Sequence, residues 1–502
     1  MNQERENYDN LAWDLNDDAL ENAQSQLMRR SFCADIVSVV SEQFGKEAIL
    51  VPPLRLGGYN MLYRVRVDGL PSDVLVRVPC PSQCQFPKEK TLQEAATALL
   101  LQQRTQLPVP KLFQYETEST IGPFLMLKYI ANEGDMSDVL SRPRHDTNEV
   151  PVLSEDLSED ILHSMYLKLA KCILPLYQPE FSRIGSLNTE SNGHISVQGR
   201  PITQNMSNMI QLANIPRDVL PSPTTTYTSA HEWYNALANM HLAQLVFQHN
   251  DLVTSEDDCR NKYISRYLFR KLAREEKVSS FGFAEDNWSA QAAKMKASCP
   301  APDMTGRFRL WCDDLRPNNF LVNGDKDIVA VIDWEFTYAA PTQFILDPPW
   351  WLLLEMPEMW PAGIADWAEH YERRLGVWLS CMESAESTST ALPFKLHEYM
   401  RESWTTGRFW LSYAARKSWA FDAIYWKYLD ARFFGERQQV SPDDSSWKSR
   451  INMLSRKDRL AMDAFVEKKM SDSVTRQLDS WSPDEVRSRM AEVLMEDDEM
   501  GF

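Results

Sequence analysis

The chain has 502 residues and an acidic balance, with 53 Lys and Arg against 71 Asp and Glu and a formal net charge of −18. This charge argues against a non-specific binder of nucleic acid or of anionic membranes, because such surfaces need a basic excess. No apolar run approaches the ~20 residues of a helical membrane span. Apolar residues make up 43% of the chain, which is enough for large cores.

The N-terminus and the cysteines predict the compartment. Residues 1–8 are polar and partly acidic, so we expect neither a secretory signal nor a transit peptide. The eight cysteines are scattered, and only Cys80 and Cys84 lie close, without the second pair or histidine cluster of a zinc site. Free thiols are typical of a reducing compartment. We therefore expect a soluble, cytoplasmic protein.

The first 130 residues change from a helical pattern to a strand-rich one. Apolar residues recur at helical spacing across 18–45, and short apolar runs follow across 48–67. Residues 74–78 and 124–130 predict strands. Between them a helix is predicted from residue 92 to about 103. Its start, Thr91-Leu-Gln-Glu94, fits a capping box.

The rest of the chain predicts a mainly helical structure. Helical patterns cover 161–177, 230–248, 257–276, 367–383 and 402–430, and helical spacing returns across 450–495. Residues 142–160 are polar with prolines, and residues 200–226 are rich in Pro, Ser and Thr, so both segments are predicted to be irregular.

The most informative residues lie in two short segments of the second half. Residues 310–322 (LWCDDLRPNNFLV) place Asp314 five positions before Asn319, and residues 331–335 (VIDWE) place Asp333 after an apolar run. Metal-dependent phosphoryl transfer needs one carboxylate to accept the hydroxyl proton, and an amide and a second carboxylate to hold Mg²⁺. An Asp/Asn-rich turn is the alternative for the first segment alone. The second segment at this interval disfavours that alternative.

These segments resemble the catalytic and metal-binding segments of the aminoglycoside phosphotransferase family, whose fold is that of the protein kinases. The family's usual loop is similar to His-Gly-Asp-Leu-His-Pro-Gly-Asn, followed by Ile-Asp-Trp-Glu. Here Cys312 stands where His is usual and Asp313 where Gly is usual, while the Asp, Leu, Pro and Asn positions are kept. The resemblance covers roughly residues 50–435, and the whole chain resembles a fungal-type branch.

The resemblance implies an α+β, bilobal protein-kinase-like fold, with a small β-rich N-lobe and a larger, mainly helical C-lobe. We expect an N-terminal helical extension at 1–47 and the N-lobe at 48–130. The C-lobe, with the catalytic and metal loops, is expected at 131–440. A C-terminal helical extension with an acidic tail is expected at 441–502.

The resemblance also predicts where the N-lobe contacts the nucleotide. Gly57, Gly58 and Asn60 lie between strand-like segments, where a nucleotide-covering loop belongs. A Gly-Gly hairpin turn would explain the glycines equally well. Kinases also pair a strand cation, which binds the phosphates, with a helix carboxylate. Arg77 and Glu94 are the candidates, although the family more widely has Lys at the strand position and Arg is usual in the fungal-type branch.

The orientation of Arg77 can be predicted from its strand. Arg77 shares one face of the strand with Leu75, so we expect it to face the nucleotide cleft. A buried charge needs a partner, and Glu94 is the nearest carboxylate in the expected place. We therefore predict that the Arg77 guanidinium lies within reach of Glu94. The alternative is that Glu94 only closes the capping box with Thr91.

Candidates for the acceptor site lie further along the C-lobe. Asp347 follows the metal-binding aspartate on a loop, where it could face the substrate cleft. Trp404 and Arg408, with Trp410 and Tyr413, lie on a predicted helix in the part of the lobe where the family binds acceptors. Packing in the core is the alternative for these residues.

Two further motifs are expected to be structural. Residues 249–251 (His-Asn-Asp) superficially resemble a catalytic loop, but Glu256 and not Asn stands five positions after Asp251. We interpret them as the end of the 230–248 helix. Cys312 has no His near it in the sequence, so we expect a buried structural thiol and not a nucleophile.

The expected function is transfer of the γ-phosphoryl group of ATP, with Mg²⁺, to a hydroxyl, or less readily an amine, of a small-molecule acceptor. Asp314 would be the base or acceptor-orienting residue, and Asn319 and Asp333 would hold Mg²⁺. Arg77, supported by Glu94, would bind the phosphates. Neither nucleic acid nor a membrane is an expected partner, and the oligomeric state and the acceptor stay open.

Two alternatives remain. A non-catalytic, kinase-like (pseudokinase) protein that binds a nucleotide or partner is suggested by Cys312, Arg77 and the short glycine loop. The presence of Asp314, Asn319 and Asp333 opposes it, because a protein without catalysis has no evident need for all three. A metal hydrolase using Asp313, Asp314 and Asp333 would lack the His ligands typical of such sites.

Overall fold

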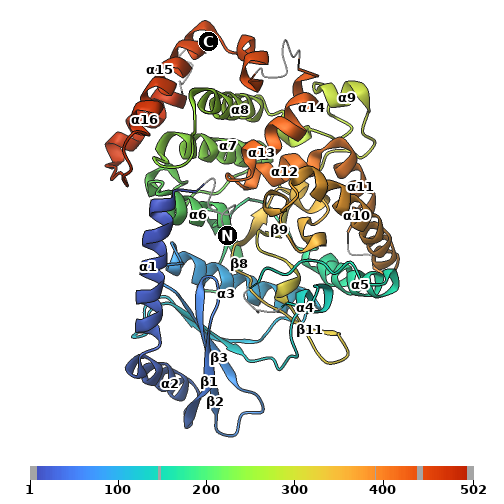
Figure 1. The fold of residues 1–502 in the computed structure, drawn as a ribbon. Helices are drawn as coiled ribbons and strands as arrows, with labels where there is room; N and C mark the ends of the chain where they lie inside the picture. Colours follow the sequence, from blue (N-terminus) through green and yellow to red (C-terminus); the bar gives the residue numbers. More distant parts are fainter. Residues whose placement is uncertain (1–7, 145–148, 390–391, 438–444, 495–502) are drawn as a thin grey trace.

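The structure is a computed structural model that describes residues 8–144, 149–389, 392–437 and 445–494. A smaller lobe built on a β-sheet adjoins a larger, mostly helical lobe (Figure 1). The bilobal, protein-kinase-like α+β fold expected from the sequence is therefore confirmed. None of the helices in the described part of the chain is long and apolar enough to cross a membrane.

The N-lobe is built on one antiparallel sheet in the order β1-β2-β3-β5-β4. Its strands are β1 (Ala48–Leu56), β2 (Asn60–Val67), β3 (Val74–Pro79), β4 (Leu112–Glu116) and β5 (Phe124–Lys128). Val74, Val76 and Val78 are buried in the core that the sheet forms with α1 (Asn10–Leu27) and α2 (Arg30–Phe44). Leu75 and Arg77 line a cavity on the other face. Because successive side chains of a strand point to opposite faces, β3 contributes alternate residues to the core and to this cavity.

The helix α3 (Pro87–Arg104) begins five residues earlier than the sequence predicted. Pro87 occupies the first turn of the helix. The backbone N–H groups of this turn have no partner within the helix, so the missing N–H of proline costs no helical hydrogen bond. Phe86 and not Thr91 is therefore the N-cap residue, and the predicted capping box is wrong. Glu94 instead lies well inside the helix, where it is buried. The helix predicted across 18–45 is also divided, since α1 ends before α2 begins.

In the described residues, the C-lobe contains most of the helices and seven short strands, which form three small sheets. Its helices are α4 (Met136–Leu140), α5 (Glu159–Leu176), α6 (Gln204–Ala213), α7 (Ala230–Phe247), α8 (Glu256–Arg274), α9 (Ala290–Lys294), α10 (Ile364–Ser387), α11 (Leu396–Thr406), α12 (Arg408–Arg416), α13 (Phe421–Ile424), α14 (Asp430–Phe434), α15 (Arg456–Asp472) and α16 (Pro483–Leu494). Its strands are β6 (Glu180–Phe181), β7 (Ser186–Thr189), β8 (Ile195–Gly199), β9 (Phe308–Cys312), β10 (Phe320–Val322), β11 (Ile328–Val331) and β12 (Thr337–Ala340).

Two segments of the C-lobe differ from the prediction. The 200–226 segment, predicted to be irregular, contains α6. The continuous helix predicted across 402–430 is broken at Gly407, which adopts a left-handed conformation with φ of +88°. A Cβ at this position would lie 2.5 Å from Arg432 Nε, so the site requires glycine. The helices predicted at 161–177, 230–248 and 257–276 are present as α5, α7 and α8.

Residues 249–251 attach both ends of the chain to the C-lobe. His249 Nδ1 lies 2.8 Å from Asp479 Oδ2, and Asn250 Nδ2 donates to Asp9 Oδ2 at 2.8 Å. Asp251 Oδ2 accepts from the backbone N–H of Asn10. These contacts agree with the interpretation of this motif as structural, and they explain why polar residues follow α7.

Helix α1 joins the two lobes (Figure 1). At its start, Asp9 caps the helix and its backbone N–H donates to Leu212 O of the C-lobe at 3.0 Å. At its end, Ala23 and Leu27 are buried in the N-lobe core, and Leu27 O accepts from Tyr63 Oη at 2.7 Å. The N-terminal extension therefore contacts both lobes.

We expect Asp9→Ala to lower the free energy of unfolding by about 2–3 kcal/mol. The change removes the cap of α1, worth roughly 1 kcal/mol, and it removes the acceptor of the buried Asn250 backbone N–H and one of the two acceptors of the Asn250 side-chain amide. Urea denaturation followed by fluorescence measures the loss. Asp18→Ala, on the exposed side of the same helix, is the control and should change stability by less than about 0.5 kcal/mol. Equal stability of the two variants would contradict the anchoring role of Asp9.

Candidate active site

A β-hairpin brings the two predicted metal-binding residues together. Strand β10 pairs antiparallel with β11, with Phe320 opposite Val331. Just outside this ladder, the backbone N–H of Ile332 donates to Asn319 O at 2.9 Å. The Asn319 side chain donates through Nδ2 to Asp314 O at 2.8 Å. Asn319, Asp314 and Asp333 are therefore adjacent because of main-chain pairing, as their spacing in the sequence suggested.

Asp333 adopts a left-handed backbone conformation with φ of 66°. For a residue with a Cβ this conformation costs roughly 1–3 kcal/mol, and such strain clusters at functional sites. Burial acts to raise the pKa of the Asp333 carboxyl, but the neighbouring Arg77 guanidinium outweighs it and holds that pKa below its ordinary value. Asp333 is therefore an ionised carboxylate at neutral pH.

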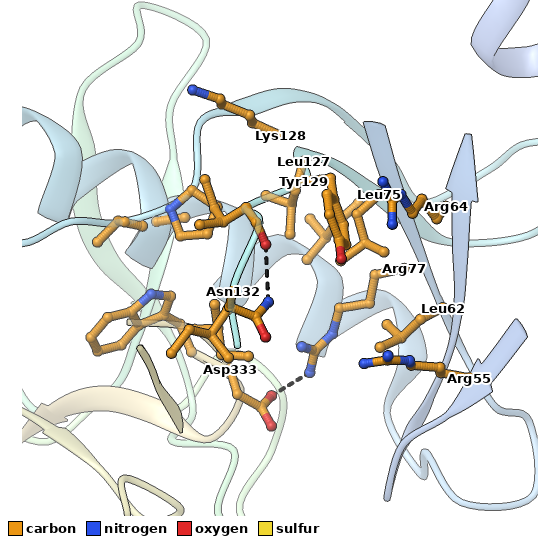
Figure 2. Close-up of a pocket in the computed structure, with 18 of the residues that line it drawn as sticks. Arg55, Leu62, Arg64, Leu75, Arg77, Leu127, Lys128, Tyr129, Asn132 and Asp333 are labelled. Atoms are coloured by element: carbon orange, nitrogen blue, oxygen red, sulfur yellow. Dashed lines mark hydrogen bonds and ion pairs between the residues drawn. The ribbon is translucent and has the colours of Figure 1, made fainter. Parts of the chain in front are cut away.

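Arg77 contacts three carboxylates from both lobes. Its Nε lies 3.2 Å from Glu94 Oε1, its Nη2 lies 3.1 Å from Glu335 Oε1, and the same Nη2 donates to Asp333 Oδ1. Figure 2 shows the guanidinium reaching from β3, beside Leu75, toward Asp333. The predicted contact between Arg77 and Glu94 is present, although Glu94 comes from the interior of α3 and not from its first turn.

Lys90 is a second buried cation that the sequence analysis missed. Its side chain is 3% exposed, and its Nζ lies 2.7 Å from Glu335 Oε2 and 3.3 Å from Glu94 Oε2. Nζ also donates to Asn60 Oδ1 at 2.8 Å. The i, i+4 spacing of Lys90 and Glu94 was visible in the sequence, but only a helix that starts at Pro87 includes both residues.

Arg77, Lys90 and the carboxylates of Glu94, Asp333 and Glu335 form one buried charge cluster. With two cations and three carboxylates the cluster carries a formal charge of 2 − 3 = −1. Burial, and then the Asp333 carboxylate, raises the pKa of Glu335 to about 8 against the opposing effect of both cations. With a proton on Glu335 at neutral pH, the two cations balance the two remaining carboxylates, and the cluster carries no excess charge.

Asp314 is buried beside this cluster. Burial raises the pKa of Asp314 to about 6, Arg316 acts to lower it, and Asp333 raises it further. Arg316 Nε lies 3.3 Å from Asp314 Oδ1. A carboxylate with a pKa near neutrality is suited to accept a proton from a substrate hydroxyl.

A cavity of about 320 Å³ lies between the N-lobe sheet, α3 and the β10–β11 hairpin. Leu62, Leu75 and Leu127 form apolar walls, and Arg77 and Asp333 line its polar part (Figure 2). An apolar slot with a few convergent polar groups is typical of a small-molecule or cofactor site.

The predicted glycine loop is a short turn between β1 and β2. The backbone N–H of Gly57 donates to Asn60 O at 2.8 Å, and neither Gly57 nor Gly58 has a positive φ. The Asn60 side chain is buried, where it donates to Glu335 Oε2 at 3.2 Å and accepts from Lys90. Asn60 therefore supports the charge cluster.

The three predicted acceptor residues have the contacts of packing residues. Arg408 is 1% exposed, its Nε lies 3.3 Å from Asp347 Oδ1, and its Nη1 donates to Gly282 O at 3.0 Å. Trp404 packs against Tyr371 with ring centroids 4.9 Å apart. None of the three lines a cavity that reaches Asp314 or Asp333.

The residues that differ from the family's loop have structural contacts. Cys312 is buried, its Sγ lies 3.4 Å from Glu335 O, and burial raises the pKa of its thiol well above the ordinary range. Asp313 Oδ1 accepts from Trp311 Nε1 at 2.8 Å and lies 3.7 Å from Arg416 Nη1. Within the described ranges, no three His, Cys, Asp or Glu side chains are arranged to hold a metal ion. The hydrolase alternative therefore gains no support.

Comparisons with known proteins do not assign the chain to a family. No family model and no curated protein matches the sequence. Among similar solved structures are the Plasmodium vivax ethanolamine kinase (TM-score 0.40, 11% identity, covering 93% of this chain and 95% of that one), APH(2″)-IIIa with GDP and kanamycin (0.35, 12%, 87% and 99%) and the spectinomycin phosphotransferase APH(9)-Ia with ADP and spectinomycin (0.33, 9%, 88% and 98%). At these scores the likeness carries no argument about activity or substrate.

We expect Lys90→Met to lower the free energy of unfolding by about 3–5 kcal/mol, because it leaves Glu335 and Glu94 buried beside a single cation. Chemical denaturation measures the change. Lys88→Met is the control on the same helix, since Lys88 is exposed and its ion-pair partner among the described residues is the exposed Glu118; its effect should stay below about 1 kcal/mol. Adding Glu335→Gln to Lys90→Met should recover part of the loss. A fully stable Lys90→Met variant would show that the cluster does not need its second cation.

Proposed function

We propose that the protein is an ATP- and Mg²⁺-dependent phosphotransferase that moves the γ-phosphoryl group of ATP to a hydroxyl, or less readily an amine, of a small molecule. The observation that carries the proposal is the convergence of Asp314, Asn319, Asp333 and Arg77 beside an apolar cavity. Similarity to the fungal-type branch of the aminoglycoside phosphotransferases is part of the proposal, whereas an aminoglycoside acceptor is not.

The site residues suit Mg²⁺ by their chemistry. Asn319 and Asp333 offer an amide and a carboxylate oxygen, the hard donors that Mg²⁺ prefers, and Mg²⁺ bound to ATP needs only one or two protein side chains. The donation from Asn319 Nδ2 to Asp314 O leaves the Asn319 amide oxygen for a ligand. When bound, Mg²⁺ would neutralise charge on the β- and γ-phosphate oxygens.

The remaining steps belong to the chain's own residues. Arg77, held by Glu94, binds the phosphates and orients them toward Asp314. The acceptor oxygen forms a bond to the γ-phosphorus, the bond to the ADP oxygen breaks, and Asp314 takes the hydroxyl proton. Catalysis then consists of positioning and electrostatic stabilisation, without a covalent enzyme intermediate.

The contact between Arg77 and Asp333 has a consequence for nucleotide binding. A guanidinium on Asp333 Oδ1 occupies one of the oxygens that a metal would use. We expect Arg77 to move from Asp333 to the phosphates, while it keeps Glu94, when Mg²⁺ and ATP bind. The same contact favours a second candidate, a non-catalytic pseudokinase in which Arg77 permanently neutralises Asp333. Turnover distinguishes the two functions.

We expect ATP to raise the melting temperature only when Mg²⁺ is present, since a ligand present at ~100 times its Kd stabilises the native state by about 2.7 kcal/mol.

Asp333→Asn should abolish this metal-dependent shift, whereas Asp314→Asn should retain the shift and lose turnover, because only Asp314 handles the acceptor proton. Asp325→Asn, an exposed residue of the β10–β11 turn, is the control for both. Full turnover by Asp314→Asn, or no shift with millimolar Mg²⁺ and ATP, would contradict the assignment.

Arg77→Ala should weaken ATP binding and lower turnover together, by about tenfold or more each, because a charge-assisted contact contributes roughly 1.5–3 kcal/mol. Arg77→Lys tests whether charge alone suffices; we expect partial recovery, since Lys lacks the fork that reaches Glu94 and phosphate at once. Calorimetry gives the Kd, and Arg66→Ala on β2 is the exposed control. A folded Arg77→Ala protein with unchanged Kd would remove the phosphate role.

A further inference from the structure

A second cavity, of about 330 Å³, reaches the proposed base by another route. Asp333 lines both this cavity and the nucleotide cavity, whereas Asp314 lines only the second one. The two spaces therefore meet at the residue proposed to hold the metal. This is the arrangement that transfer from a nucleotide to an acceptor requires, because the reacting groups must approach each other at that point.

Helix α1 forms one wall of the second cavity. Trp13 and Asn16 of α1 line it, together with Gln211 of α6. Gln211 Nε2 donates to Asn16 Oδ1 at 3.0 Å and to Gln83 Oε1 at 2.6 Å. These two hydrogen bonds join α1, α6 and the segment before α3 around one space. The N-terminal extension thus contributes side chains to the proposed reaction site, beyond its contacts with both lobes.

Primary amides and charged side chains contribute equally to the polar lining of this cavity, with five residues each. The five amide side chains that line it are Asn16, Gln83, Gln204, Asn208 and Gln211. Gln83 is 9% exposed, and its Nε2 has no hydrogen-bond partner among the described residues. A buried donor without a partner costs roughly 1–3 kcal/mol of stability. A ligand oxygen that accepts a hydrogen bond from Gln83 Nε2 would remove this cost. Gln83 is therefore an independent indication that the cavity takes a polar ligand.

The charges of the cavity restrict the class of ligand. Arg316 Nε lies 3.3 Å from Asp314 Oδ1, so these two charges offset each other, and Asp17 is a further carboxylate of the lining. Asp333 and Glu335 also line the cavity, but Arg77 and Lys90 already contact these carboxylates. A hydroxyl group both donates and accepts hydrogen bonds, as a primary amide does, so amides and hydroxyls match each other without charge.

We propose that this cavity is the acceptor site and that it takes a neutral, polyhydroxylated small molecule, a sugar or polyol, against a wall formed by α1. Trp13 and Tyr59 provide apolar surface for the carbon skeleton. The volume lies at the lower end of the roughly 300–1,000 Å³ of ligand sites, which suits a molecule of monosaccharide size. The inference rests on the proposed function, because it assigns the acceptor of the same reaction.

The first test is a comparison of acceptors. ADP release with Mg²⁺ and ATP is measured with D-glucose, D-ribose, myo-inositol and glycerol as neutral probes, and with ethanolamine and kanamycin as cationic ones, all at millimolar concentration. We expect at least one neutral probe to raise the rate above the acceptor-free rate. Stimulation by the cationic probes alone, or by none of the probes, overturns the assigned class.

The second test locates the site. Asn16→Ala and Gln211→Ala should each raise the KM of the active polyol by about tenfold, since one hydrogen bond to a ligand contributes on the order of 1.4 kcal/mol. The Kd for ATP, measured by calorimetry, should stay the same, because neither residue lines the nucleotide cavity. Asn22→Ala is the matched control: it lies on α1, is exposed, and its side chain bonds only to its own helix at Asp18 O.

The outcomes separate this inference from the proposed function. Metal-dependent ATP binding and loss of turnover in Asp314→Asn, together with an unchanged KM in Asn16→Ala and Gln211→Ala, would overturn the acceptor site and leave the phosphotransferase intact. Absence of metal-dependent ATP binding would overturn both. A raised KM in both variants, with an unchanged Kd for ATP and an unchanged KM in Asn22→Ala, supports the site.

Discussion

The site depends on one buried charge cluster between the lobes. Arg77 and Lys90 belong to the N-lobe, whereas Asp333 and Glu335 belong to the C-lobe. Removing one partner of a buried ion pair is strongly destabilising, because the other charge is left uncompensated. These ion pairs therefore oppose a displacement of one lobe relative to the other. The same contacts set the shape of the cleft and bring the candidate phosphate-binding and metal-binding groups together.

The N-terminal helix adds a second constraint to the cleft. Kinase-like enzymes commonly gate catalysis by moving lobes or loops around the substrate. Here α1 is attached to the C-lobe through Asp9 and to the N-lobe through Leu27, so that it links the two lobes directly. A helix that spans the cleft and also lines a cavity beside Asp314 would couple acceptor binding to the relative position of the lobes.

The departures from the family's usual loop become understandable in this setting. Cys312 fills a buried position against Glu335 O, and Asp313 is directed toward Trp311 and Arg416. Both residues support the loop from outside the proposed reaction path. Arg77 on β3 is accompanied by Lys90 on α3, so that the cluster holds two cations, and the planar guanidinium of Arg77 contacts three carboxylates at once.

The sequence by itself determined the β-rich and helical halves and the positions of Asp314, Asn319 and Asp333, because these follow from local periodicity and from spacing within one hairpin. The alternation along β3 also predicted the side on which Arg77 lies. Only the tertiary structure revealed Lys90, the amide-lined cavity and the role of α1. Their contacts join distant positions, such as Asn60 and Glu335, which are 275 residues apart. No local pattern encodes such a contact, since it arises only when both lobes pack.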